Sequence, residues 1–308
     1  MSLTTDKRRA MFMVLIAVGF AVSQDAIVKA MSGGYPTWET VCFRGLFATP
    51  FFVAWVLWER VQVWPLPKAW GLVLLRSAIL FSAYIAFALS IATLPLANAV
   101  AIYFTMPFFV GGLSGWFLGE KVPGYRWAAI LMGFIGVLIS VRPGSETFQP
   151  ASLLALYSAL GYAVGQMLGR KVSQEVDPLF IGNMQSLFYL FGAGLLGLVI
   201  TGLHLDATDQ HTFAALTKPL ATPGTGDIAV LALMGLFSAI SSVFFVKAYQ
   251  AAPASFVAPF EYSAMIWALL YGVVVFHDFP DAWTLAGAAI VVVAGLSMLW
   301  RDGLQNNG

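Results

Sequence analysis

Apolar runs of about 20 residues follow one another along most of the chain, and they limit its possible folds more than any other feature. Only 10% of the residues are charged, whereas soluble domains carry about 25%. Runs of this length cross the hydrocarbon core of a bilayer, where the backbone must bond to itself in helices or in a closed barrel. Because the runs are continuous rather than alternating, we expect an all-α integral membrane protein that has the lipid bilayer as a partner.

Composition also excludes several function classes. The net charge of +1 and the lack of a basic stripe argue against a nucleic-acid partner. The single cysteine, Cys42, allows no internal disulfide and no cysteine cluster for a metal. The three histidines fall in predicted loops, and no catalytic motif is present. We therefore expect neither an enzyme nor a cofactor or metal.

Hydropathy windows predict ten transmembrane helices. They lie near residues 10–31, 37–58, 69–92, 97–118, 124–141, 151–171, 178–202, 227–251, 255–276 and 282–300. The first run, after Lys7-Arg8-Arg9, could instead be a secretory signal. It belongs to an internal repeat, however, which favours a first span that is retained.

The internal repeat divides the chain into units 1–148 and 149–308. An offset of 142 aligns seven identical residues within twenty positions, from Ala17 on Ala159 to Pro36 on Pro178. After a long connector, about 203–226, the best offset becomes 158 and aligns Pro95 with Pro253. The difference of 16 marks this connector as an insertion on the external side.

Each unit has five predicted spans, an odd number, so the second unit must enter the membrane from the opposite side. We therefore expect two inverted five-helix repeats, which are typical of secondary transporters. Lys and Arg number ten on one side and three on the other, which predicts that both termini are cytoplasmic. Glycines at 111, 115 and 119, and at 161, 165 and 169, predict close helix contacts, either static or sliding during transport.

Charged side chains inside the predicted spans need partners or water, because a charge in hydrocarbon is costly. Asp25 and Lys29 lie four residues apart and can pair on one helix face. Glu39 and Arg44 lie at similar depth near the external side. We interpret the four either as a latch on that side or as a fixed structural network.

Two further basic residues, Arg76 and Lys247, lie toward the cytoplasmic ends of their helices. Their long stems allow the charges to reach the interface. The alternative is contact with an anionic substrate group such as a carboxylate.

Glu261 lies in a span with few other ionisable groups. We interpret it as a candidate proton carrier, with protons as a candidate coupling ion, or as a partner for a substrate amine. The alternative is pairing with a basic side chain such as Lys247. The repeat places Tyr103 opposite Glu261, and Gln24 opposite Gln166, around one central axis.

These residues predict an amphipathic cavity for a small organic molecule, although each could instead bond a neighbouring helix. Further cavity candidates are Tyr84, Tyr162, Asn183, Gln185, Ser241, Ser242, Tyr262 and Trp267. Prolines near the starts of the fourth and ninth helices free backbone carbonyls and allow bending, which makes them hinge candidates. They are Pro95, Pro107, Pro253 and Pro259.

The segment from Ala97 to Gly144, with its elbow Leu118-Gly119-Glu120-Lys121, resembles the EamA branch of the drug/metabolite transporter superfamily. The resemblance covers nearly the whole chain, although the second elbow reads His277-Asp278. It implies a ten-helix bundle with a cavity bounded mainly by helices 1, 3, 4, 6, 8 and 9. Family members carry aromatic amino acids, choline, riboflavin and S-adenosylmethionine.

The chain also has a looser similarity to the S-adenosylmethionine-type subgroup. The residues that carry it are Asp25 with Lys29, Glu39 with Arg44, Arg76-Ser77, Lys247, and Ala258-Pro259-Phe260 followed by Tyr262.

We expect a bacterial inner-membrane carrier, a monomer or weak dimer, that moves a small amphipathic metabolite by alternating access. An amino acid or amino-acid-derived compound is the leading substrate class. The alternatives are an uptake carrier for S-adenosylmethionine, riboflavin or a similar metabolite and, from a different class, a passive channel. The direction of transport stays open.

Overall fold

The structure is a computed structural model of the whole chain. It describes residues 3–60, 69–106, 108–109, 113, 124–142, 149–172, 175–203, 214–251, 260–261 and 263–305. Predictions for Pro107, Pro253, Pro259, Tyr262 and the elbow at 118–121 lie outside the described residues, as does the side chain of Gln166.

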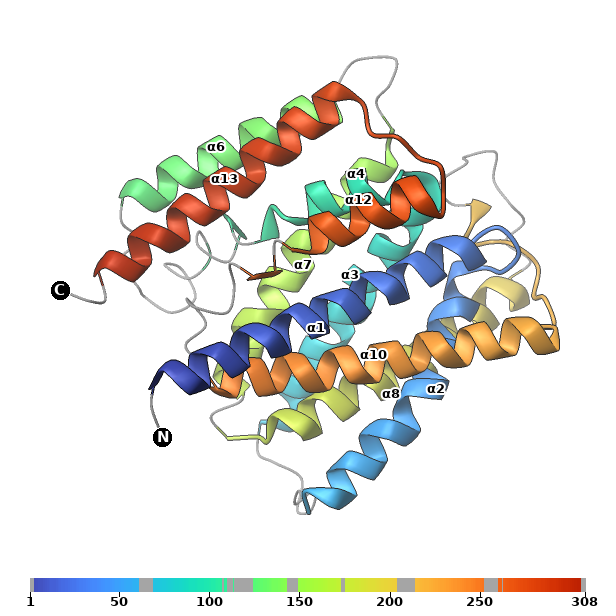
Figure 1. Cartoon of the computed structure of the whole chain (residues 1–308). Coiled ribbons are helices and arrows are strands. Elements are labelled where there is room, and N and C mark those ends of the chain that lie inside the picture. The colour runs from blue at the N-terminus through green and yellow to red at the C-terminus, as the bar shows by residue number, and fades with distance from the viewer. Residues whose placement is uncertain are drawn as a thin grey trace.

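Within the described ranges the regular secondary structure is helical (Figure 1). The helices are α1 (Leu3–Met31), α2 (Thr37–Trp58), α3 (Trp70–Thr93), α4 (Leu96–Tyr103), α6 (Gly124–Val141), α7 (Ala151–Val172), α8 (Pro178–Gly202), α10 (Thr225–Ala251), α12 (Ala264–Val274) and α13 (Ala282–Gln305). Six of them, α1, α2, α3, α7, α8 and α10, are long and apolar enough to cross a membrane. Shorter apolar stretches lie in α6, α12 and α13. The expected all-α architecture is confirmed for the described residues.

Local chemistry sets several helix starts. Asp177 precedes α8 and accepts a hydrogen bond from the Leu179 backbone N–H at 2.7 Å, with Pro178 in the first helical turn. Asp281 does the same for α13, accepting from the Thr284 N–H at 2.8 Å. Both aspartates satisfy backbone donors that the first turn of a helix leaves unpaired.

The sequence predicts one continuous helix over residues 97–118. This prediction is wrong, because α4 ends at Tyr103. The Thr105 N–H bonds to the Ile102 carbonyl at 3.0 Å, and the Thr105 hydroxyl donates to the same carbonyl at 2.7 Å. These short-range bonds replace the regular helical pattern. Pro107 follows in the sequence and has no N–H with which to restore it.

A matching break interrupts the predicted helix at 255–276, where α12 begins only at Ala264. The Ser263 N–H bonds to the Phe260 carbonyl at 3.1 Å, and the Ile266 N–H bonds to the Ser263 carbonyl at 3.0 Å. Residues 158 positions earlier form the same two bonds, both at 3.0 Å, between Thr105 and Ile102 and between Phe108 and Thr105. The two breaks therefore share one hydrogen-bonding pattern at equivalent positions.

Long helices pack in antiparallel pairs. In the pair of α1 and α10, Ser241 donates to the Ala17 carbonyl at 2.9 Å and the rings of Phe20 and Phe237 lie 5.0 Å apart. Residue numbers rise along one helix as they fall along the other, so the two run in opposite directions. α3 and α7 pair in the same way, with Arg76 Nε bonded to the Gly165 carbonyl and the Ser82 and Tyr157 hydroxyls 2.9 Å apart.

Two further antiparallel pairs join equivalent helices of the two proposed units. α2 contacts α8 through Thr49 and Ser186, whose hydroxyls are 3.1 Å apart, and through Cys42 and Leu190. α6 lies beside α13 along one side of the bundle (Figure 1). α4 and α12 contact each other between that pair and the remaining helices (Figure 1).

Glycines permit these close approaches. A Cβ added at Gly161, Gly165 or Gly169 would lie 2.8, 2.5 or 3.0 Å from side-chain atoms of α3, so the predicted contact face on α7 is confirmed. The face predicted at 111, 115 and 119 lies outside the described residues. Gly45 of α2 is tighter still, because its added Cβ would meet the Leu190 backbone N at 2.4 Å.

We predict that Gly45→Ala lowers the Tm of the purified protein, because the backbone of α8 must move to admit the methyl group. Overpacking of this kind costs about 1–3 kcal/mol. Gly182→Ala is the matched control in α8, since its Cβ would meet only Phe52 at an ordinary 3.5 Å. Equal Tm values for the two variants would contradict this packing.

Candidate functional site

Arg44 occupies the point where four helices meet. Its Cζ lies 4.0 Å from the ring centroid of Tyr84 on α3 and 4.4 Å from that of Tyr189 on α8. Its Nε donates to Ser238 Oγ on α10 at 3.0 Å. Cation–π contacts of this kind are stronger when the charge is desolvated. Arg44 therefore lies at the centre of the bundle. Of the four charges expected to cluster, it interacts with Asp25, whereas Lys29 and Glu39 have other partners in the described chain.

Tyr84 also connects Arg44 to α1. Gln24 Nε2 donates to Tyr84 Oη at 2.9 Å and to Asp25 Oδ1 at 3.1 Å. Tyr84 Oη donates to the same carboxylate oxygen at 3.4 Å. The negative charge of Asp25 thus lies beside the hydroxyl of Tyr84, while the positive charge of Arg44 lies against its ring.

The network continues from Tyr189 toward the start of α3. Gln185 Nε2 donates to Tyr189 Oη at 2.8 Å, and Gln185 Oε1 accepts from Arg76 Nη1 at 2.8 Å. Arg76 Nε donates in addition to the Gly165 carbonyl at 3.2 Å. Arg76 therefore has internal partners at two of its three guanidinium nitrogens, rather than only reaching toward an interface.

Aromatic rings form a second part of the site. Tyr103, the last residue of α4, lies 5.1 Å from the ring of Phe87 and 5.6 Å, edge-on, from that of Tyr162. Tyr103 also interacts electrostatically with Glu261. Tyr103 and Glu261 are also the two residues that the repeat aligns.

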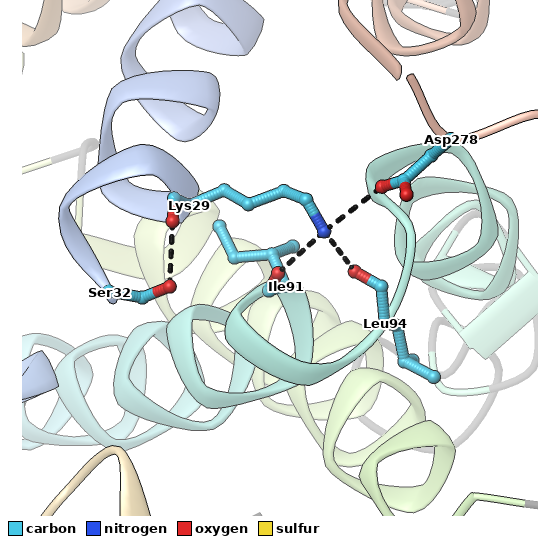
Figure 2. Close-up of polar contacts among 5 residues, drawn as sticks. All are labelled: Lys29, Ser32, Ile91, Leu94 and Asp278. Atoms are coloured by element: carbon cyan, nitrogen blue, oxygen red, sulfur yellow. Dashed lines mark hydrogen bonds and ion pairs between the residues drawn. The ribbon is translucent and has the colours of Figure 1, made fainter. Parts of the chain in front are cut away.

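Lys29 lies one turn beyond Asp25, in the last turn of α1 (Figure 2). Its Nζ lies 3.3 Å from Asp278 Oδ2 and donates to the carbonyls of Leu94 at 2.7 Å and Ile91 at 3.4 Å. The predicted Asp25–Lys29 pair is therefore wrong. Its four-residue spacing permits a pair, but the Lys29 stem reaches three acceptors at the end of α3 and on the connector to α13 instead.

Other polar contacts join the same end of the bundle. Lys218 Nζ donates to the carbonyls of Ser32 and Gly33 at 2.5 and 2.7 Å. Glu39, buried at the start of α2, accepts from the Ala221 N–H at 3.4 Å rather than joining a cluster with Arg44. The described part of the predicted insertion, 214–226, thus packs against the α1–α2 connection.

Arg142 pairs with Asp281 in this region as well. Hydrogen bonds from Thr284, together with the charge of Arg142, lower the pKa of Asp281.

The remaining predicted residues have different surroundings. Ser241 is used in helix packing, and Trp267 lies over Gly19 and stacks on Tyr271 at 6.4 Å. Asn183 has a buried Oδ1 without a partner in the described chain, while Ser242 is half-buried on α10. Lys247 is exposed, with Nζ 5.2 Å from the Trp55 ring, so its described contact is an aromatic ring and not Glu261. Pro95 directly precedes α4.

Sequence reasoning missed three residues, namely Tyr189, Ser238 and Asp278. Tyr189 could have been found, because it lies one helical turn after Gln185 and would share its face. In the sequence, Asp278 stands out only as part of the second elbow, His277-Asp278. Ser238 carried no signal beyond being polar within a span.

The family profile described as the EamA-like transporter family matches residues 8–142 and again residues 149–300. The chain belongs to this family. It is thus a drug/metabolite-type transporter and a multi-pass membrane protein. The two matched segments together cover most of the sequence.

Curated relatives with several different names resemble the chain over most of its length. An S-adenosylmethionine uptake transporter of Rickettsia conorii is 22% identical over 94% of this chain and 91% of its own. A riboflavin transporter of Rhizobium johnstonii is 29% identical over 95% and 91%. A pseudopaline exporter of Pseudomonas aeruginosa is 26% identical over 95% and 96%. A crystal structure with 17% identity covers 96% of both chains at a TM-score of 0.62, which shows a shared fold.

We predict that Tyr84→Phe destabilises the protein, because it removes the acceptor of Gln24 and a donor to Asp25 inside the bundle. A buried polar group left without its partner costs about 1–3 kcal/mol. The expected result is a lower Tm in detergent. Tyr157→Phe is the matched control, since its hydroxyl also bonds a serine of α3 but its side chain is exposed. An equal loss of Tm in both variants would show that the buried bonds of Tyr84 contribute no more to stability than the exposed bond of Tyr157.

Proposed function

We propose that the chain is a secondary transporter that moves a small amphipathic metabolite by alternating access. The observation that carries the proposal is the polar and aromatic network running from Asp25 through Tyr84, Arg44 and Tyr189 to Arg76. Its members come from α1, α2, α3 and α8 and contact α7 and α10, so it joins helices of both sequence units. Ionisable groups buried in a membrane bundle mark substrate and ion pathways.

We infer that the units 1–148 and 149–308 are inverted repeats. Three observations support this topology. Equivalent helices α2 and α8 run antiparallel. The pairing of α1 with α10 has its counterpart in that of α7 with α3. The breaks at Thr105 and Ser263 share one backbone pattern.

With both termini cytoplasmic, Lys29 and Asp278 lie at the external end and Arg76 nearer the cytoplasmic end. This orientation follows the excess of Lys and Arg on the cytoplasmic side. The proposed location is the bacterial inner membrane, and the proposed assembly is a monomer or weak dimer.

An amino acid or amino-acid-derived compound is the proposed substrate class. The site offers charges of both signs together with aromatic rings, which suits a molecule with charged groups and an apolar body. Relatives named for S-adenosylmethionine uptake support this class, and a riboflavin carrier remains the alternative. Glu261, near Tyr103, is the proposed proton carrier or amine partner.

Lys29 and Asp278 form the proposed external gate. The bridge joins α1 of the first unit to the connector before α13 in the second, so separation of the units at this end must break it (Figure 2). The breaks after Tyr103 and before Ala264, with Pro95 at the start of α4, are the proposed bending points.

We predict saturable counterflow in proteoliposomes loaded with a transported compound, because an alternating-access carrier exchanges ligand across the membrane. The panel contains phenylalanine, S-adenosylmethionine and riboflavin. Conductance that does not saturate, without counterflow, would identify a passive channel instead.

We predict that Glu261→Gln, if Glu261 carries protons, loses proton-driven accumulation under a pH gradient and keeps counterflow. If Glu261 binds the substrate amine, the variant should lose both. Behaviour identical to wild type in both assays would exclude Glu261 from coupling and from substrate binding.

We predict that Asp278→Ala loosens the external end. Hydrogen–deuterium exchange should accelerate about fivefold at the Leu94 and Asn98 amides, which corresponds to about 1 kcal/mol for a partly exposed ion pair. Asp281→Ala is the control, because it removes a neighbouring carboxylate that pairs with Arg142 and not with Lys29. Equal exchange at these amides in both variants would exclude Asp278 as a gate.

A further inference from the structure

We propose that Arg44 and Asp25 together bind the zwitterionic head of an α-amino acid group. The substrate carboxylate binds Nη1 of Arg44 and the substrate ammonium binds Asp25. This inference rests on the proposed function and assigns its substrate site.

The Arg44 guanidinium is held in place but is incompletely bonded. Nε has Ser238 as its acceptor, and the rings of Tyr84 and Tyr189 cover the guanidinium. Nη1 is buried and has no hydrogen-bond acceptor in the described chain. A buried donor of a charged group without an acceptor is costly, and a carboxylate is the acceptor that best fits a guanidinium. The arrangement orients a cation and leaves one of its nitrogens for a ligand.

Asp25 supplies the opposite charge close by. Its Oδ1 accepts from neutral donors, Gln24 and Tyr84. Asp25 and Arg44 attract each other electrostatically, yet no ion pair between them occurs within the described residues. Tyr84 lies between them, with its hydroxyl on Asp25 and its ring against Arg44. Two opposite charges kept apart by a shared tyrosine match a ligand that carries an ammonium and a carboxylate group on the same carbon.

The other basic residues of the described spans are less suited to this role. Lys29 already has a carboxylate and two carbonyls. Arg76 is bonded at Nε and at Nη1. Lys247 is exposed and lies over Trp55. Arg44 alone among these four combines central placement with a buried, unbonded nitrogen.

Ligand analogues that lack one charge test the site directly. Binding to the purified full-length protein is measured by calorimetry for phenylalanine, phenethylamine and 3-phenylpropionate. A second set compares S-adenosylmethionine with its decarboxylated form, and riboflavin represents a ligand without an amino acid head. The variants are Arg44→Gln, Arg44→Lys and Asp25→Asn, with Lys247→Gln as the control.

Wild type and Lys247→Gln should bind at least one amino acid ligand about tenfold or more tightly than its decarboxylated analogue, because a charged hydrogen bond is worth about 1.5–3 kcal/mol. Arg44→Gln should reduce this carboxylate preference to less than about twofold and keep any preference for the amine. Asp25→Asn should reduce the preference for the amine and keep the preference for the carboxylate. Arg44→Lys should restore part of the carboxylate preference. A purely structural role would weaken all ligands equally and would not separate the two preferences.

The inference is overturned if wild type binds none of the amino acid ligands, if it does not discriminate among the analogues, or if both variants lower all affinities by one factor. Counterflow of riboflavin by a wild type that ignores amino acids would overturn this site and leave the transporter function standing. Conductance without counterflow would overturn the transporter function itself, whatever the protein binds.

Discussion

The cost of a charge in hydrocarbon governs how this bundle is built, and Arg44 shows how several helices share that cost. The guanidinium is surrounded by groups from α3, α8 and α10, and it projects from α2. Removing any of these helices would expose a cation to lipid, at a cost of several kcal/mol. The two sequence units are therefore joined at their centre by a shared charge, in addition to glycine-mediated contact.

The same requirement explains the irregular positions in the fourth and ninth predicted spans. A helix that breaks in the membrane must bond its freed backbone groups within the protein. At Thr105 this is done locally, by the residue's own N–H and hydroxyl on the Ile102 carbonyl. Ser263 repeats the backbone bond to Phe260. Each break thus bonds part of its freed backbone locally, and Tyr103 and Glu261 lie directly beside these breaks.

The sequence predicted the helices well and their side-chain partners poorly. Hydropathy located most helix ends within a few residues, because lipid imposes helical structure over a fixed thickness. The end of α4 at Tyr103 could not be predicted from hydropathy, because apolar composition carries no information about one local hydrogen bond. Spacing suggested that Asp25 and Lys29 pair, but a lysine stem reaches many acceptors and tertiary packing selects among them. Tyr84 and Arg44 were identified as polar groups within spans, while their contacts with Tyr189 depended on α8 crossing α2 at Gly45.

The bonding of Lys29 has a consequence for how the external end can open. Its two carbonyl partners, Ile91 and Leu94, lie at the end of α3 in the first unit, where helix C-termini favour cations. Asp278 belongs to the second unit, as does Phe276, whose ring centroid lies 5.2 Å from Lys29 Nζ. When the units separate, Lys29 loses these contacts and keeps the two carbonyls, so the ammonium is never left bare in an apolar setting. A bridge of this composition resists opening by about the strength of one partly exposed ion pair, roughly 0–1 kcal/mol, which suits a gate that must open and close in every transport cycle.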